Sequence, residues 1–259
     1  MQNNVIGIDI GGTKINGVLF DGKKVLKELE IKTPDNLFDF EKNLLKLTDF
    51  LSANAKVSAV GVGMAGLIDL KTGVVKYSPN IKFIKNFQLA KFFKLNGYKN
   101  VRVDNDAKCF ARAENMLGQG RGVKNMVGIT LGTGIGGGII FNGEIYRGAR
   151  FGAGEFGHMM FSSKETIESV FQKARDKQDN KALAEIIGVL FTNIYRAIDP
   201  DCIILGGGVA TDKSRNFINQ AKAFCKKNLL AYKIEPKNIL VSKLKNAGAL
   251  GAALLFFQT

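Results

Sequence analysis

The chain has 259 residues, of which 46% are hydrophobic and 23% charged, a composition typical of soluble globular proteins with one large or two small domains. No apolar run approaches the roughly 20 residues of a membrane span, and the first residues, MQNNVIGIDI, lack a secretion signal. The net charge is +14, but no compact basic run is present, so we expect a Lys-rich surface rather than a nucleic-acid site. Three widely spaced cysteines, Cys109, Cys202 and Cys225, indicate a reducing compartment, and we expect a cytoplasmic protein without disulfides or a membrane partner.

Strands and helices alternate along the chain. In chain order we expect a strand–glycine turn–strand unit at 5–22, a helix at 37–51, a strand at 57–66, a helix at 87–97, a strand at 100–103, a helix at 106–118, a second strand–glycine turn–strand unit at 126–143, a helix at 180–198, a strand at 202–208, a helix at 217–229, a strand at 238–241 and a final apolar helix. This alternation predicts an α/β protein with buried, partly parallel sheets. A cleft between its two halves is the expected ligand site.

The two strand–turn–strand units are copies of one pattern. VIGIDIGGTKINGVLFDG begins at Val5, and MVGITLGTGIGGGIIFNG begins 121 residues later at Met126. At that offset glycines coincide in both turns, and so do strand residues such as Phe20 and Phe141. Two halves facing each other would present two anion-binding turns to one polyphosphate chain.

The second unit also contains G-x-G-x-x-G, which in dinucleotide-binding proteins is followed at once by a helix. Here the glycines are followed by a strand, an Asn142-Gly143 turn and another strand, which is a hairpin pattern. The Gly-Lys-Ser/Thr of a nucleotide-binding P-loop is missing as well. We therefore expect a β-hairpin whose tip offers backbone N–H groups to an oxyanion.

Several ordered motifs resemble those of the ROK family (repressors, uncharacterised frames and kinases), a group of actin-like sugar kinases. DIGGTK at 9–14 and LGTGIGGG at 131–138 resemble the two phosphate motifs, and DPDCIILGGGV at 199–209 resembles the adenosine motif. VDNDAKC around Asp106 and GAGEFGHMMF around His158 make the resemblance specific to this family.

The resemblance covers nearly the whole chain. It implies an α/β fold of two ribonuclease-H-like (actin-like ATPase) domains with an interdomain active-site cleft. The last helix would return to the first domain, so the implied domains are 1–104 with 245–259, and 105–244. The implied activity is that of an ATP- and Mg²⁺-dependent sugar kinase.

The two glycine turns offer N–H groups, hydroxyls and one ammonium to phosphates, unless they are merely structural hairpins. Their residues are Gly11, Gly12, Thr13 and Lys14 in the first turn and Gly132, Thr133 and Gly134 in the second. Asp9, at a strand end, would either position Mg²⁺ through water or cap a turn. Gly207 and Gly208, between a strand and a helix, would let the backbone lie flat against adenine or ribose.

Asp106 is the candidate general base, because it follows a strand and begins a helix, where the N-terminus favours the ionised carboxylate. The alternative is an N-cap Asp without chemistry. The resemblance implies that Asp106 takes the proton of the sugar hydroxyl and that Asn105 binds a sugar hydroxyl.

Other residues resemble the sugar contacts of the family. Carboxylates are suited to sugar hydroxyls because they accept two hydrogen bonds, and an imidazole both donates and accepts. The implied sugar ligands are Glu155, His158 and Glu168, with Gly66 and Asn80 from the first half. Glu165 is a rival to Glu168, and His158, the only histidine, has a structural role as its alternative.

The sequence departs from the family after His158, where most members carry C-x-C-G-x-x-G-C, a structural zinc site. This chain has FSSKETIESV there, and none of its cysteines is near His158 in sequence. The stretch between Glu168 and Leu183 is also shorter than usual. We therefore expect no zinc, with the sugar-side wall altered.

The leading hypothesis is phosphorylation of glucose at its 6-hydroxyl by ATP, with an N-acetylhexosamine (particularly N-acetylmannosamine) or fructose as open alternatives. Inorganic polyphosphate is an alternative donor, which the basic charge would suit. The ROK repressors carry an N-terminal helix-turn-helix, and the first strand here begins at about Asn4, so a DNA-binding role is not expected. A catalytically silent sugar sensor is the non-enzymatic alternative, and we expect a homodimer.

Overall fold

The computed structural model describes residues 4–212, 216–230 and 238–257. The chain divides into two compact units, unit 1 with residues 1–113 and 244–259, and unit 2 with residues 114–243. The division lies within helix α3 (Asp106–Met116), later than the boundary expected before Asn105. The reason is packing, since the backbone of Cys109 in α3 lies directly against Gly251 of the C-terminal helix.

Unit 1 is built on a five-stranded sheet with the order β3-β2-β1-β4-β8. Its strands are β1 (Asn4–Ile10), β2 (Lys14–Phe20), β3 (Val25–Lys32), β4 (Val57–Met64) and β8 (Val101–Asp104). Strand β1 is antiparallel to β2 and parallel to β4, which is parallel to β8. The register aligns Asp9 with Gly63 and Gly63 with Asp104, so the carboxyl ends of three parallel strands lie side by side.

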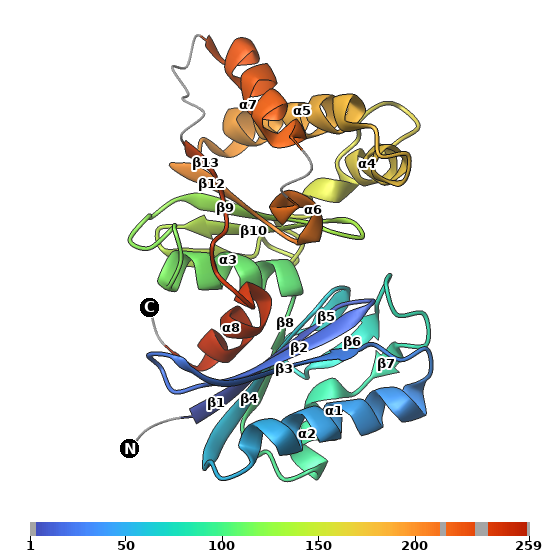
Figure 1. The fold of residues 1–259 in the computed structure, drawn as a ribbon, viewed down its shortest axis with the longest axis vertical. Helices are drawn as coiled ribbons and strands as arrows, with labels where there is room; N and C mark the ends of the chain where they lie inside the picture. The colour runs from blue at the N-terminus through green and yellow to red at the C-terminus, as the bar shows by residue number, and fades with distance from the viewer. Residues whose placement is uncertain (1–3, 213–215, 231–237, 258–259) are drawn as a thin grey trace. The chain divides into compact units, whose positions relative to one another are not determined.

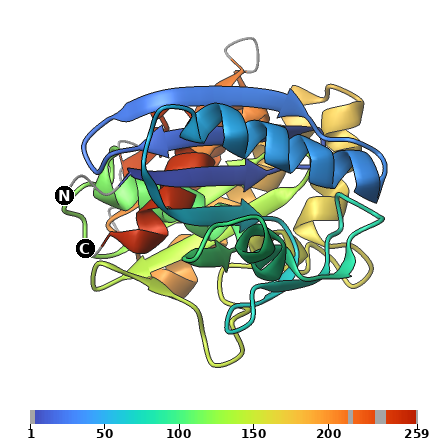
Figure 2. The ribbon, with the colours of Figure 1, turned by 90° about the horizontal axis from the view of Figure 1, so that it is seen from below.

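Helices α1 (Leu37–Ser52) and α2 (Leu89–Leu95) cover one face of this sheet, and α8 (Ala247–Ala253) covers the other (Figure 1). Figure 2 views the face that α1 and α2 cover. The buried face of α1 consists of Phe40, Leu44, Leu47, Thr48 and Leu51, whereas Leu37 at its start is exposed. A small sheet of β5 (Leu67–Asp69), β6 (Val74–Tyr77) and β7 (Lys85–Phe87) also belongs to unit 1, and a 3₁₀ turn, η4 (Leu254–Phe256), follows α8.

Helix α8 reaches the backbone of the central strands because glycines leave room for it. An added Cβ at Gly7 would collide with the carbonyl oxygen of Ala249, and one at Gly61 would collide with that of Ala252. Gly7 lies in β1 and Gly61 in β4, and they are direct neighbours in the sheet. Bare backbone at these positions of β1 and β4 is therefore needed for helix packing.

Unit 2 repeats the sheet of unit 1, with the order β11-β10-β9-β12-β13. Its strands are β9 (Met126–Leu131), β10 (Ile135–Phe141), β11 (Glu144–Tyr146), β12 (Cys202–Gly206) and β13 (Ile239–Val241). Strand β9 is antiparallel to β10 and parallel to β12, as β1 is to β2 and β4. The internal repeat is thus confirmed at the level of strand pairing.

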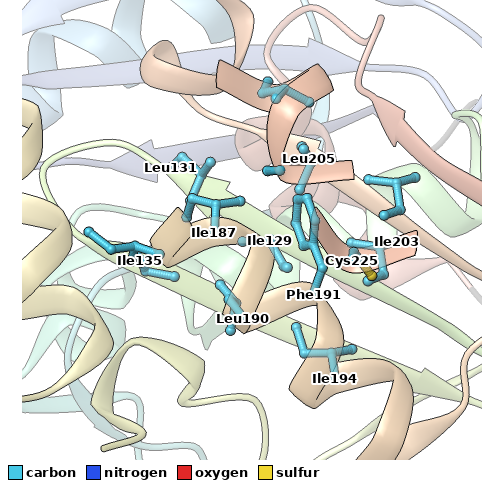
Figure 3. Close-up of a cluster of buried hydrophobic side chains, with 14 of the residues drawn as sticks. Ile129, Leu131, Ile135, Ile187, Leu190, Phe191, Ile194, Ile203, Leu205 and Cys225 are labelled. Atoms are coloured by element: carbon cyan, nitrogen blue, oxygen red, sulfur yellow. The ribbon is translucent and has the colours of Figure 1, made fainter. Parts of the chain in front are cut away.

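The hydrophobic core of unit 2 lies between this sheet and helices α5 (Asn180–Ile198) and α7 (Phe217–Asn228). Figure 3 shows strand residues meeting helix residues there, among them Ile129, Leu131, Ile203, Leu205, Ile187, Leu190, Phe191 and Cys225. No helix in the described part of the chain is both long and apolar enough to cross a membrane.

Helices α4 (Ile167–Asp176) and α6 (Gly208–Thr211) and several short strands are absent from the sequence-based expectation. A signal for α4 exists, because Thr166 is its N-cap and accepts a hydrogen bond from the N–H of Ser169. Its buried residues, Ile167, Phe171 and Ala174, also have helical spacing. Polar residues between them obscure the pattern in a helix this short.

The close packing of α8 is testable at Gly61. Because a methyl group there would collide with the Ala252 carbonyl, we expect Gly61→Ala to lower the free energy of unfolding by about 1–3 kcal/mol or more, as overpacking of a core does. Gly152→Ala is the matched control, since no atom lies within 4 Å of a Cβ at that position. Urea unfolding of the two variants measures the difference, and equal stabilities would contradict the packing described here.

Candidate active site

Asp9 and the first glycine turn lie at the carboxyl end of β1. The turn follows β1 directly, and its Gly11 N–H donates to the Lys14 carbonyl at 2.9 Å. The Gly11 carbonyl accepts from the Thr33 hydroxyl at 2.7 Å, and the Thr13 carbonyl accepts from the Thr33 N–H at 3.0 Å. Thr33 is buried and was not among the residues predicted from sequence.

The Asp9 carboxylate is held in an environment that suits a bound cation. Burial, and to a smaller extent the negative charge of Asp106, raise its pKa to about 7. Gly248 of α8 contributes to this burial, because a Cβ there would collide with Asp9 Oδ2. Two carboxylates that repel each other fit Mg²⁺, which takes one or two carboxylates together with water and phosphate oxygens.

Asp106 is not the N-cap of α3. The carbonyl oxygen of the Asn105 side chain accepts from the N–H groups of Ala107 at 3.1 Å and Lys108 at 3.2 Å, which makes Asn105 the cap. The capping alternative for Asp106 is therefore wrong, and Asp106 occupies the first turn, where the helix dipole favours its ionised form. The amide nitrogen of Asn105 keeps two donors that suit a hydroxyl ligand.

Asp104, the last residue of β8, supports this segment. Its carboxylate accepts from the N–H of Asn105 at 2.9 Å and lies 3.6 Å from the guanidinium of Arg112. The Asp104 side chain is 1% exposed, so this ion pair is buried on the carboxylate side. The pair ties the end of β8 to α3 and thereby fixes the backbone around Asn105 and Asp106.

Asn80 lies against the first turn, and Gly66 lies against Tyr77 and Ser78 in the same unit. Gly66 has φ 136°, and an added Cβ would collide with the Tyr77 carbonyl. A Cβ on Gly12 would lie 2.9 Å from Cβ of Asn80 and 3.0 Å from its carbonyl oxygen. A predicted sugar ligand and a predicted phosphate-binding glycine are therefore direct neighbours.

Lys14 has another partner in the structure. Its ammonium lies 2.7 Å from Oε1 of Glu30 on the neighbouring strand β3, with both side chains more than half exposed. The ammonium that the sequence assigned to phosphate is thus engaged with a carboxylate in this structure. The backbone of the first turn, and not Lys14, is the part that the fold holds in place.

The second glycine turn is held by Glu168 of α4. The Glu168 carboxylate accepts from the N–H of Ile135 at 2.6 Å. An added Cβ on Gly134 would collide with this carboxylate, whereas one on Gly132 has no atom within 4 Å. Gly134 therefore has no room for a side chain because Glu168 lies against it, whereas Gly132 has an open face.

Glu155 and His158 lie beside Glu168. Glu155 precedes the 3₁₀ turn η1 (Phe156–His158) and His158 ends it, with His158 Nε2 4.0 Å from Glu155 Oε2 and both side chains exposed. A Cβ on Gly157 would lie 3.2 Å from Glu168 Oε2, so η1 packs against that carboxylate. The three predicted sugar ligands of unit 2 are thus gathered next to the second turn.

Glu165 does not join this group. Its carboxylate lies 2.7 Å from the ammonium of Lys173 in α4, an ion pair at the surface. The chain turns back on itself here, because the N–H groups of Phe161 and Ser162 both donate to the Glu165 carbonyl. A hairpin closed by hydrogen bonds therefore stands where most of the family has its zinc loop.

Gly207 and Gly208 follow β12, next to the second turn. Gly207 has φ 85°, and a Cβ there would collide with the carbonyl of Leu131, the last residue of β9. Gly208, which begins α6, has no atom within 4 Å of a Cβ position. Its exposed backbone could therefore lie against a flat ring, while Gly207 is needed for strand packing.

Known proteins similar to this chain include sugar kinases. The model of the ROK family matches residues 5–174 and 163–259. A beta-glucoside kinase of Listeria monocytogenes is 30% identical over 296 aligned residues, covering 98% of this chain and 97% of the relative. An N-acetyl-D-glucosamine kinase of Mannheimia succiniciproducens is 28% identical, covering 96% of this chain and 98% of the relative.

Among solved structures, a ROK family glucokinase from Streptomyces griseus in complex with glucose and AMPPNP has a TM-score of 0.80. It is 26% identical and covers 98% of this chain and 99% of its own. The chain belongs to the ROK family. The expected α/β fold of the actin-like ATPase class is thereby confirmed.

The expectation of no structural zinc stays a prediction. The cysteines are buried thiols, Cys109 in unit 1 and Cys202 and Cys225 in unit 2, and the described residues contain no cluster of three or more His, Cys, Asp or Glu that fits a metal. We expect elemental analysis of the purified protein to find zinc well below one atom per chain. EDTA should leave its melting temperature unchanged. A stoichiometric, tightly held zinc would contradict the prediction that this chain has no structural zinc site.

Proposed function

We propose that this chain transfers the terminal phosphoryl group of ATP to the 6-hydroxyl of a hexose of gluco configuration, with glucose as the first candidate. Membership of the ROK family, among relatives named as sugar kinases, makes it a phosphotransferase with a sugar hydroxyl as acceptor. The glucokinase solved with glucose and AMPPNP supports a nucleotide donor. The finer choice of glucose, and of Mg²⁺ as the metal, is our proposal.

The observation that carries the proposal is the arrangement of Asp9 and Asp106 around the carboxyl ends of the parallel strands in unit 1. Asp106 follows β8, is free of the capping role and stands at a helix N-terminus. It is therefore suited to accept the proton of the attacking hydroxyl. Asn105, Asn80 and Gly66 would orient the sugar from the same unit.

The glycine turns would hold the phosphates through backbone N–H groups, with Asp9 positioning Mg²⁺ through water. Bound Mg²⁺ supplies charge neutralisation on the phosphate oxygens. In unit 2, Glu155, His158 and Glu168 would accept from and donate to sugar hydroxyls. Glu168 would do so from a fixed position, because the Ile135 N–H already holds one of its oxygens.

The acceptor and donor are tested together in one assay. ADP release is followed over a panel of glucose, a β-glucoside, N-acetylglucosamine, N-acetylmannosamine and fructose, and product is then measured with polyphosphate in place of ATP at matched ionic strength. We expect the highest kcat/KM with glucose and ATP. A higher value with an N-acetylhexosamine would replace glucose as the proposed acceptor, and a higher value with polyphosphate would replace ATP as the proposed donor. No turnover at all would favour a silent sensor.

The role of Asp106 is tested by Asp106→Asn, which keeps the size of the side chain but removes its basicity. We expect kcat to fall by about 10²–10⁴, as loss of a general base does, with sugar and nucleotide dissociation constants near normal. Loss of a helix cap should not contribute to any change in melting temperature, because Asn105 and not Asp106 caps α3. Asp49→Asn, on the exposed side of α1, is the control of equal charge. Turnover close to wild type would remove Asp106 from the mechanism.

A further inference from the structure

The carbonyl of the first glycine in each phosphate turn is held by a side chain from another element. In the first turn the Thr33 hydroxyl donates to the Gly11 carbonyl. In the second turn Nη1 of Arg175 donates to the Gly132 carbonyl at 2.9 Å and also to the Thr133 carbonyl. Gln172 adds a bond of 3.2 Å to the Thr133 carbonyl, so α4 holds this turn with three residues in all, Glu168, Gln172 and Arg175.

The N–H groups of the second turn divide into two sets. Gly132 N–H donates to the Gly134 carbonyl at 3.0 Å, and Ile135 N–H donates to Glu168. For the two amides between them, Thr133 and Gly134, the described residues provide no hydrogen-bond acceptor. Two successive amides are therefore left to bind something outside the described chain.

The first turn has the same two amides in the same places. Gly11 N–H donates to the Lys14 carbonyl, and no acceptor for Gly12 or Thr13 N–H is found in the part of the chain that the structure describes. At the repeat offset of 121 residues, Gly12 corresponds to Thr133 and Thr13 to Gly134. The two turns thus leave the same two amides without an acceptor, although their other hydrogen bonds differ.

Peptide geometry links the held carbonyls to these amides. In a planar trans peptide the C=O of one residue and the N–H of the next point in opposite directions. Because Arg175 holds the carbonyls of Gly132 and Thr133 toward α4, the N–H groups of Thr133 and Gly134 are directed away from α4. Two successive N–H groups on one side of a turn form a concave site for an anion.

We propose that Arg175 is a positioning residue for the second phosphate turn. Its guanidinium fixes two carbonyls, so that the amides of Thr133 and Gly134 face an oxygen of the nucleotide's phosphate chain. In the first turn the Thr33 hydroxyl fixes the Gly11 carbonyl, and with it the direction of the Gly12 amide alone. Asp176 lies 2.8 Å from Nη2 of Arg175 and also accepts from Nε at 2.9 Å. Because this carboxylate neutralises the guanidinium, we expect Arg175 to affect nucleotide binding by holding the turn in shape rather than by attracting the phosphates with its charge. The inference rests on the proposed kinase function.

The test compares Arg175→Met with Lys177→Met. Both variants remove one positive charge from the C-terminal end of α4, but the Lys177 side chain is exposed and, among the described residues, makes no hydrogen bond to the turn. We expect Arg175→Met to raise the KM for ATP, and the dissociation constant of ADP by calorimetry, by about tenfold or more, the size that loss of an outer supporting group has at metal sites. The KM for the sugar should stay within about twofold in both variants, a change too small to count as lost binding energy.

Arg175→Lys keeps one charged donor without the fork, so its KM for ATP should lie between wild type and Arg175→Met. It also carries the test should Arg175→Met fail to fold, because it should raise the KM for ATP and leave that for the sugar unchanged. Equal effects of Arg175→Met and Lys177→Met, or equal increases of both KM values in any Arg175 variant, overturn the inference. A wild-type chain that neither binds ADP nor turns over overturns the proposed function itself, which is a distinct result.

Discussion

Backbone contact between α8 and the central strands of unit 1 is the constraint on which the first half of the candidate site depends. Gly7 in β1 and Gly61 in β4 let the last helix approach to the distance of main-chain atoms. Gly248 at the start of that helix then covers the Asp9 carboxylate. Burial of Asp9, and with it the raised pKa, is a consequence of how tightly α8 packs. A looser helix would leave the carboxylate in water, where it would need no cation to offset its charge.

The glycines of the central strands and of the two turns have two different roles, close packing between elements and exposure of backbone amides in the turns. Those within β1 and β4 allow elements to pack at short distance, whereas those in the turns leave amides available to an anion. Gly134 belongs to both groups, because it lies in a turn and yet lacks a side chain on account of Glu168. The carbonyls of the turns are held by side chains from elsewhere in the chain, so the shape of the proposed phosphate sites depends on residues outside the turns.

The repeated hairpins, the α/β alternation and the strand-end position of Asp106 were predictable, because they follow from periodicity and from residues adjacent in sequence. The N-cap role of Asn105 instead of Asp106 depends on a one-residue difference in where α3 begins, which sequence patterns do not resolve. The ion pair of Lys14 with Glu30 and the bonds from Arg175 to the second turn join residues far apart in the chain. Such contacts arise only from tertiary packing, so no local signal could indicate them.

The discontinuity of unit 1 has a consequence for the order in which the protein matures. Unit 2 is one continuous segment, whereas unit 1 lacks its last helix until residues 244–259 have been synthesised. During translation the sheet surface around Gly7 and Gly61 therefore stays uncovered until α8 has been synthesised, whereas the residues of unit 2 can already pack together. Strand β1 therefore gains its full set of neighbours only once α8 has been added, although it is synthesised long before that helix. The packing around Asp9 is thus completed by α8, and not by the N-terminal part of unit 1 alone.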